Sequence, residues 1–149
     1  MNLDGSVTIM APREKVWEFL TDAEGVSKCA PGLDSMEIIT PDEKFKVVAS
    51  VGFGTVKVTF TTDVEWLDLD PPNQAKVKAH GIAPGSAIDA TAEMTLSDGS
   101  EKDSTDMAWK ADVLVSGSIA SLASRLMPSV TKKLTGAFFE CVKKHVEES

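Results

Sequence analysis

The chain has 149 residues, of which 42% are hydrophobic and 26% charged, so we expect one ordered domain over 1–149 with a sizeable core. The formal net charge of −8 disfavours nucleic acid as a partner, because phosphate backbones bind clustered Lys and Arg. No apolar run approaches the roughly 20 residues needed to cross a bilayer, and residues 1–10 do not form a signal peptide. We therefore expect a cytoplasmic protein.

The first thirty residues predict one strand and two short helices. Every second residue between 3 and 9 is apolar or Gly, which is the period of a half-buried strand. Pro12 is suited to the start of a helix, where its missing N–H is not needed. A second short helix should end near Cys29.

Six further strand patterns follow, and turn-forming residues separate them. In the segment 55–67, apolar residues alternate with charged ones. One face of the predicted sheet is therefore exposed to solvent, and the other is buried under another element. Consecutive strands joined by short turns predict an antiparallel meander. The strands are predicted at 36–40, 45–51, 55–67, 75–82, 86–96 and 103–115, and the turns at Pro41-Asp42, Gly52-Phe53-Gly54, Pro71-Pro72-Asn73, Pro84-Gly85 and Asp98-Gly99.

The final segment, 118–148, predicts one long helix. Its apolar residues recur at steps of three and four, which gives a helix with one apolar face. Pro128 lies inside this pattern and should kink the helix. A basic strip on the opposite side is typical of a solvated face, but it also suits docking to an acidic partner or a membrane. The strip consists of Lys132, Lys133, Lys143 and Lys144.

This order of elements predicts an α+β domain in which a curved antiparallel seven-stranded sheet wraps the last helix. Small residues recur on the inner side of the predicted strands, which leaves room for a ligand, although a solidly packed core is the ordinary alternative. The turn Pro31-Gly32-Leu33 should lie at the rim of this cavity. The predicted lining residues are Phe60, Ala79, Ala92, Met94, Trp109, Ala123, Leu126, Met127, Val130 and Phe138.

The two cysteines raise the question of a nucleophile or a metal site. A catalytic cysteine needs a base, and neither His80 nor His145 lies in a recognisable motif. Cys141 and His145 have the i, i+4 spacing that could place two ligands on one ion, with Cys29 and His80 completing the set, but no paired motif accompanies them. We therefore predict no metal site. We expect both cysteines to be thiols in a reducing compartment, not part of a disulfide framework, and Cys29 to be a small buried residue.

The carboxylates of the predicted sheet give no sign of acid–base catalysis. Asp63 and Glu65 fall on the wet face, where solvated carboxylates are ordinary. The inner side carries Thr62 and almost no titratable group, whereas enzymes that move protons need an acid or a base inside the cleft. The sequence therefore favours binding of an apolar molecule over its transformation, and we predict no catalytic residue and no cofactor.

Several motifs occur together in a specific order. They are an early Gly5, a helix "VWEFLTD", a Cys-x-Pro-Gly turn at Cys29–Gly32, the helix opening "GSIASLASRL", and the pair Phe138-Phe139. In this order and spacing the chain resembles the CoxG family, named for the G subunit of carbon monoxide dehydrogenase, a branch of the START-like (SRPBCC) helix-grip superfamily. The resemblance covers essentially the whole chain and implies a helix-grip fold with an apolar cavity.

The resemblance also implies a function. Members of the family are expected to be non-catalytic accessory or recruitment subunits of a molybdenum-containing carbon monoxide dehydrogenase or a related hydroxylase, carrying a lipid or a quinone-like molecule. A cyclase- or dehydratase-like enzyme on the same fold and a purely protein-binding module remain as alternatives. Many members continue past the last helix into a tail that can reach the membrane. This chain stops at Ser149, and we expect membrane contact, at the inner face, to be peripheral at most.

Overall fold

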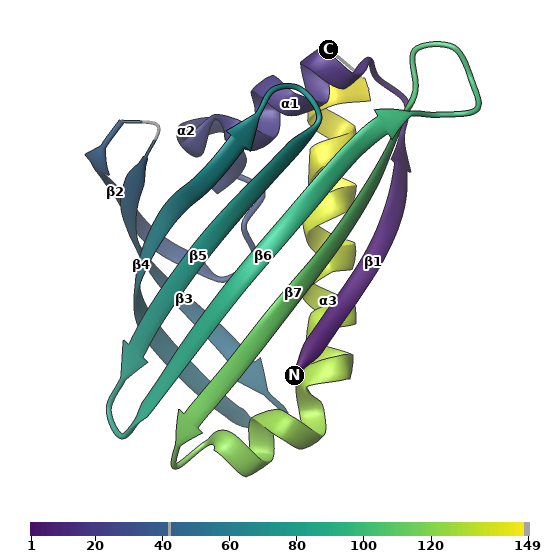
Figure 1. Cartoon of the computed structure of the whole chain (residues 1–149). Helices are drawn as coiled ribbons and strands as arrows, with labels where there is room; N and C mark the ends of the chain where they lie inside the picture. The colour runs from purple at the N-terminus through teal and green to yellow at the C-terminus, as the bar shows by residue number, and fades with distance from the viewer. Residues whose placement is uncertain (42, 148–149) are drawn as a thin grey trace.

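The computed structural model describes residues 1–41 and 43–147, and it confirms the predicted α+β architecture (Figure 1). One strand and two short helices precede a run of six strands, and a single long helix follows. The elements are β1 (Asn2–Ile9), α1 (Arg13–Thr21), α2 (Ala23–Ser27), β2 (Leu33–Thr40), β3 (Lys44–Phe53), β4 (Val56–Asp70), β5 (Gln74–Ala83), β6 (Ser86–Asp98), β7 (Thr105–Gly117) and α3 (Ala120–Glu147).

All seven strands belong to one antiparallel sheet in the order β1-β7-β6-β5-β4-β3-β2. The first strand therefore pairs with the last, and β1 and β2 form the two edges. Figure 1 shows the sheet curving around α3, which lies along its concave side, while α1 and α2 cover one end. The chain thus forms the predicted grip around its last helix.

The strand registers confirm the predicted inner face. Val64 pairs with Ala79, Ala79 with Ala90, and Ala92 with Ala111. Directly paired residues of an antiparallel sheet project to the same face. The small and apolar residues of four neighbouring strands therefore share the concave side, as their alternation predicts.

Most strand boundaries differ from the prediction by one to three residues, and two of these differences have a local cause. β2 begins at Leu33, so the chain becomes extended as soon as it leaves the Pro31-Gly32 turn. β7 begins at Thr105, because Asp103 adopts a left-handed conformation with φ 56° that a strand cannot contain. The predicted turn at Asp42 and the predicted helix end at 148 include positions that lie outside the described residues.

The long helix α3 has 28 residues and contains Pro128. Figure 1 shows its first turns running at an angle to the rest of the helix, in agreement with the kink expected where proline removes a backbone hydrogen bond. None of the helices among the described residues is both long and apolar enough to span a membrane.

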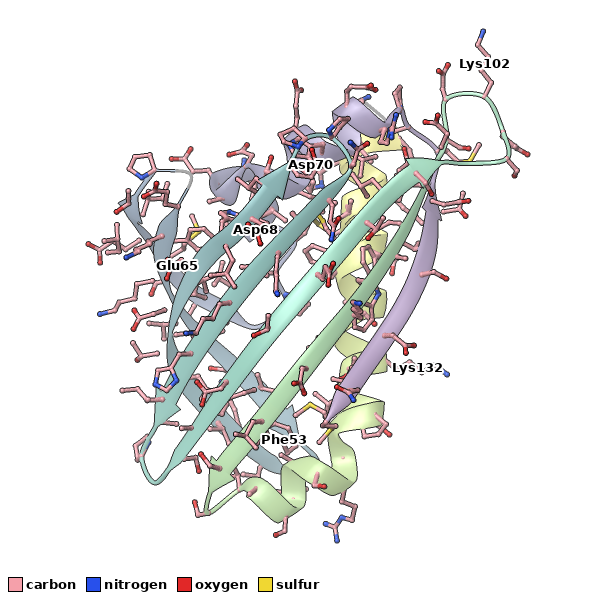
Figure 2. The ribbon with its side chains drawn as sticks, viewed as in Figure 1. Phe53, Glu65, Asp68, Asp70, Lys102 and Lys132 are labelled. Atoms are coloured by element: carbon pink, nitrogen blue, oxygen red, sulfur yellow. A yellow bond between two sulfur atoms is a disulfide. The ribbon has the colours of Figure 1, made fainter. Side chains whose placement is uncertain are left out.

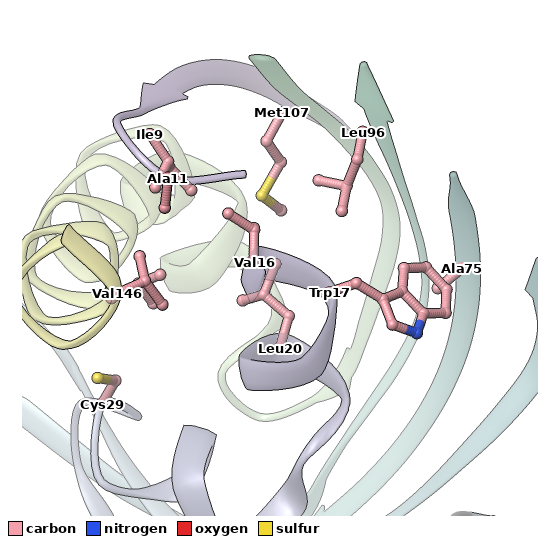
Figure 3. Packing of buried hydrophobic residues seen from close by; sticks show 11 residues of the cluster. Ile9, Ala11, Val16, Trp17, Leu20, Cys29, Ala75, Leu96, Met107 and Val146 are labelled. Atoms are coloured by element: carbon pink, nitrogen blue, oxygen red, sulfur yellow. The ribbon is translucent and has the colours of Figure 1, made fainter. Parts of the chain in front are cut away.

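Two separate clusters of buried side chains hold α3 to the sheet. The α1-end cluster lies beneath α1 (Figure 3) and consists of Ile9, Ala11, Val16, Trp17, Leu20, Cys29, Ala75, Leu96, Met107, Val142 and Val146. The hairpin-end cluster lies at the other end of the grip, where Figure 2 labels Phe53, and consists of Phe53, Phe60, Val113, Ala123 and Met127.

A disulfide joins Cys29 to Cys141, so the prediction of two thiols was wrong. The residues are 112 positions apart in the chain, but the fold places their Cα atoms 5.4 Å apart, within the range that a disulfide spans. Cys29 is 5% exposed, as predicted for a small buried residue. The bond fastens the turn after α2 to the last part of α3.

Reduction of this disulfide should lower the free energy of unfolding by about 2–4 kcal/mol, because the unfolded chain regains the freedom of a long loop. Denaturant unfolding with and without a phosphine reductant measures the difference. In a Cys141→Ser variant the reductant should have no further effect. Equal stability of the oxidised and reduced wild-type protein would contradict the prediction.

Candidate functional site

The inner face of the sheet is largely apolar. The registers place side chains such as Val64, Val77 and Ala92 on this face. Among the described strand residues that project inward, none is Asp, Glu, His, Lys or Arg. The centre of the wall carries Thr62, whose hydroxyl has no hydrogen-bond partner among the described residues.

The centre of this apolar wall is not filled by packing. Thr62, Val64, Val77, Ala79 and Ala92 are half-buried, although α3 lies on their side of the sheet, and none of them belongs to either buried cluster. Side chains at the centre of a packed core are normally fully buried. The two clusters therefore close the ends of the grip, and solvent reaches the sheet between them.

The ten predicted lining residues fall into three groups. Phe60, Ala123 and Met127 are buried in the hairpin-end cluster, and Leu126 and Val130 pack against it. Met94, Trp109 and Phe138 pack, half-buried, against the α1-end cluster. Ala79 and Ala92 lie between the clusters, half-buried, and contact with a ligand stays a prediction for all ten residues.

An open groove of about 850 Å³ runs between β1 and α3. Leu3, Gly5, Val7 and Trp109 line it from the sheet, and a row of α3 residues lines it from the helix. The Trp109 ring packs over Gly5, and an added Cβ would lie 2.8 Å from its Nε1, so a larger residue here would displace the ring. Trp109 is the one predicted lining residue in this groove. The helix residues are Pro128, Thr131, Lys132, Thr135, Gly136, Phe139, Glu140 and Lys143.

The predicted rim turn is held tightly against β3. The backbone oxygen of Gly32 accepts a hydrogen bond of 2.8 Å from the Ser50 amide. Gly32 has φ 75°, and a Cβ at this position would lie 2.2 Å from the Ser50 oxygen. Only glycine fits a left-handed conformation with so close an approach. The role of Pro31, Gly32 and Leu33 as an entrance to the cavity stays a prediction.

The four metal-ligand candidates do not all meet. His145 Nδ1 lies 3.7 Å from the sulfurs of both Cys29 and Cys141, but His80 lies on the other face of the sheet and pairs with Asp89 at 2.5 Å. The sequence suggested this set of four, and it was set aside because no paired motif accompanies it. Cys29, Cys141 and His145 do come together, whereas His80 does not.

The model of one family matches residues 5–147, and its description is that of CoxG, the G subunit of carbon monoxide dehydrogenase. The chain belongs to the CoxG family. This confirms the resemblance drawn from the Cys-x-Pro-Gly turn, the helix opening and the Phe-Phe pair. Comparison with curated proteins gives no match.

Solved structures show the fold of this CoxG-family chain to be START-like. A conserved protein from Geobacillus kaustophilus is 27% identical, with a TM-score of 0.90, and the match covers 100% of this chain and 97% of that one. The Zhui aromatase/cyclase from Streptomyces sp. R1128 is 19% identical, with a TM-score of 0.74 and coverage of 99% and 93%. A START superfamily protein from Mycobacterium smegmatis is 11% identical, with a TM-score of 0.71 and coverage of 99% and 97%.

The rim turn of this CoxG-family chain gives a stability prediction. Gly32→Ala should lower the free energy of unfolding by about 2 kcal/mol or more, because the new methyl group meets the Ser50 oxygen at positive φ. Gly136→Ala is the matched control: a Cβ there meets nothing within 4 Å, and it lies inside α3, so this change should add about 0.5–1 kcal/mol. Denaturant unfolding of both variants tests the pair, and equal effects would refute it.

Proposed function

We propose that this chain is a non-catalytic carrier of a hydrophobic small molecule of the lipid or quinone class. The ligand would lie between the centre of the concave face and α3. One observation carries the proposal: the inner wall between the two buried clusters is apolar, half-buried and without a titratable group among the described strand residues. Binding sites for small apolar molecules have this character.

The Thr62 hydroxyl gives the site one polar contact. It projects from the centre of the inner wall and has no hydrogen-bond partner among the described residues. A polar group in a partly buried place is stabilised when a ligand supplies a partner. A quinone carbonyl accepts such a hydrogen bond, whereas a hydrocarbon does not, so Thr62 favours the quinone class.

The family supports a role beside a redox enzyme. We propose that the chain acts as an accessory or recruitment subunit of a molybdenum-containing carbon monoxide dehydrogenase or a related hydroxylase. It would work in the cytoplasm, with peripheral contact at the inner face of the membrane at most. The family description names the dehydrogenase, and an apolar carrier would be able to exchange a redox-active lipid with such a partner.

A cyclase-like enzyme is the second candidate, and the likeness to the aromatase/cyclase supports it. Proton transfer in such an enzyme requires an acid or a base within hydrogen-bond reach of the substrate. The described strand residues offer none on the inner face. Turnover of a cyclisable polyketide-like substrate by the purified protein would favour the enzyme over the carrier.

Narrowing the inner wall should weaken binding. Ala92→Trp places an indole in the half-buried centre of the wall and should lower the affinity for a short-chain quinone at least tenfold, because the ring occupies the ligand's space. Equilibrium dialysis measures the affinity, and circular dichroism checks the fold. Ala108→Trp is the matched control, since Ala108 is exposed on the outer face of β7. Equal affinity of both variants and the wild type would refute the proposed site.

Removing the polar contact should distinguish ligand classes. Thr62→Val keeps the shape of the side chain but removes the hydroxyl, and one net hydrogen bond of about 1 kcal/mol corresponds to roughly a fivefold loss of affinity. The loss should appear with the quinone and be absent with an aromatic hydrocarbon of similar size. An equal loss with both probes would contradict hydrogen bonding by Thr62.

A further inference from the structure

Three potential metal ligands meet at a place that the proposed carrier function does not use. Cys29 lies in the turn after α2, and Cys141 and His145 lie one turn apart on α3. Their donor atoms, two sulfurs and one imidazole nitrogen, all lie within 4.8 Å of one another. The fold therefore brings together, from two distant segments, a group of donors that neither segment provides alone.

The two sulfur–nitrogen distances in this group match those of a tetrahedral zinc site. Zinc binds thiolate sulfur at about 2.3 Å and imidazole nitrogen at about 2.0–2.1 Å, so a sulfur and a nitrogen on one ion lie about 3.6 Å apart. His145 Nδ1 lies 3.7 Å from the Cys29 sulfur and 3.7 Å from the Cys141 sulfur. The nitrogen is already placed for an ion shared with both sulfurs.

The disulfide closes this site, because a disulfide sulfur carries no thiolate charge for a metal. We propose that reduction of the Cys29–Cys141 bond opens a zinc site formed by Cys29, Cys141 and His145. The reductant is a dithiol, which gives two electrons and two protons and becomes a disulfide itself. The two new thiols then lose their protons to water as two sulfur–zinc bonds form.

The opening requires only a small movement. A disulfide holds its sulfurs about 2.05 Å apart, and two thiolates on one tetrahedral zinc ion lie about 3.8 Å apart, so the sulfurs separate by less than about 2 Å. Rotation of the two cysteine side chains provides this. The Cα atoms, at 5.4 Å, need no large displacement, and the turn stays beside α3.

His145 is accessible and oriented. Its side chain is exposed, so an ion can reach it from solvent, and its ring stacks on Phe19 with centroids 5.4 Å apart. Nδ1 lies 3.0 Å from the Cys141 carbonyl oxygen and donates to it in the disulfide form. Zinc binding uses the other tautomer, with the proton on Nε2. The group holds three donors among the described residues, and water takes the fourth position.

Zinc would then replace the disulfide as the tie between two segments. In both states the turn that contains Cys29 is fastened to α3, by a covalent bond when oxidised and by the ion when reduced. Metal binding to a folded site stabilises the folded state. The reduced protein should therefore recover stability on addition of zinc.

Cobalt titration of the full chain tests the site. Wild-type protein reduced with a phosphine, which offers no competing thiol, should bind one equivalent of Co²⁺ with thiolate-to-cobalt charge-transfer absorption. The oxidised protein should show no such band. Competition with Zn²⁺ should abolish it, since zinc prefers the same tetrahedral donors.

Variants identify the ligands. His145→Gln should weaken metal binding at least about 100-fold, since even loss of a group that only orients a ligand costs 10- to 100-fold. Because His145 is exposed, this variant keeps the fold, which circular dichroism verifies. His80→Gln is the matched control and should bind like the wild type. The proposal is refuted if the reduced wild type shows no charge-transfer band, if the oxidised protein binds equally, or if His145→Gln retains wild-type affinity.

Discussion

The helix α3 packs against the concave sheet at two separate places, one at each end of the sheet. The accessible apolar surface between these two places depends on this division of the packing. Bulky side chains such as Phe53 and Phe60 fill one end, and Trp17 and Leu20 fill the other. Between them the sheet presents small side chains, such as Val64, Ala79 and Ala92, that stay half-buried and belong to neither cluster. The accessible surface in the middle is therefore a consequence of side-chain size along the strands, since the backbone of the grip is continuous.

The same arrangement explains why the interior suits a carrier better than a proton-transfer enzyme. In an antiparallel sheet with one solvent-exposed face, charged residues alternate with apolar ones and project to that face. Asp63, His80 and Asp89 all follow this alternation. His80 and Asp89 form an ion pair on the outer face when the imidazole is protonated. The period of two that creates the apolar wall thus also keeps acids and bases away from it.

The alternation of residues was enough to predict which face of each strand lies inside, because a strand has a side-chain period of two. The same alternation places His80 on the outer face, since Ala79 faces inward, and the register with Asp89 confirms this. Cys29, Cys141 and His145 were recognised in sequence as possible partners, but that they meet could not be established, because it depends on how far the sheet curves and where α3 crosses it. The groove beside β1 was not predicted either, because it also depends on where α3 crosses the sheet. In the sequence, the helix residues that line it, such as Lys132 and Thr135, are typical of a solvent-exposed face.

The pairing of β1 with β7 has a consequence for how the chain folds. Asn2 lies opposite Asp112, and Ile9 opposite Thr105, so β1 has no partner in the sheet until β7 has been synthesised. Contacts between residues so distant in the chain form slowly, because a long loop must close first. The polar residues Asp4, Ser6 and Thr8 keep one face of β1 compatible with water during that delay. The groove beside α3 is thus bordered by the strand that is expected to join the sheet last.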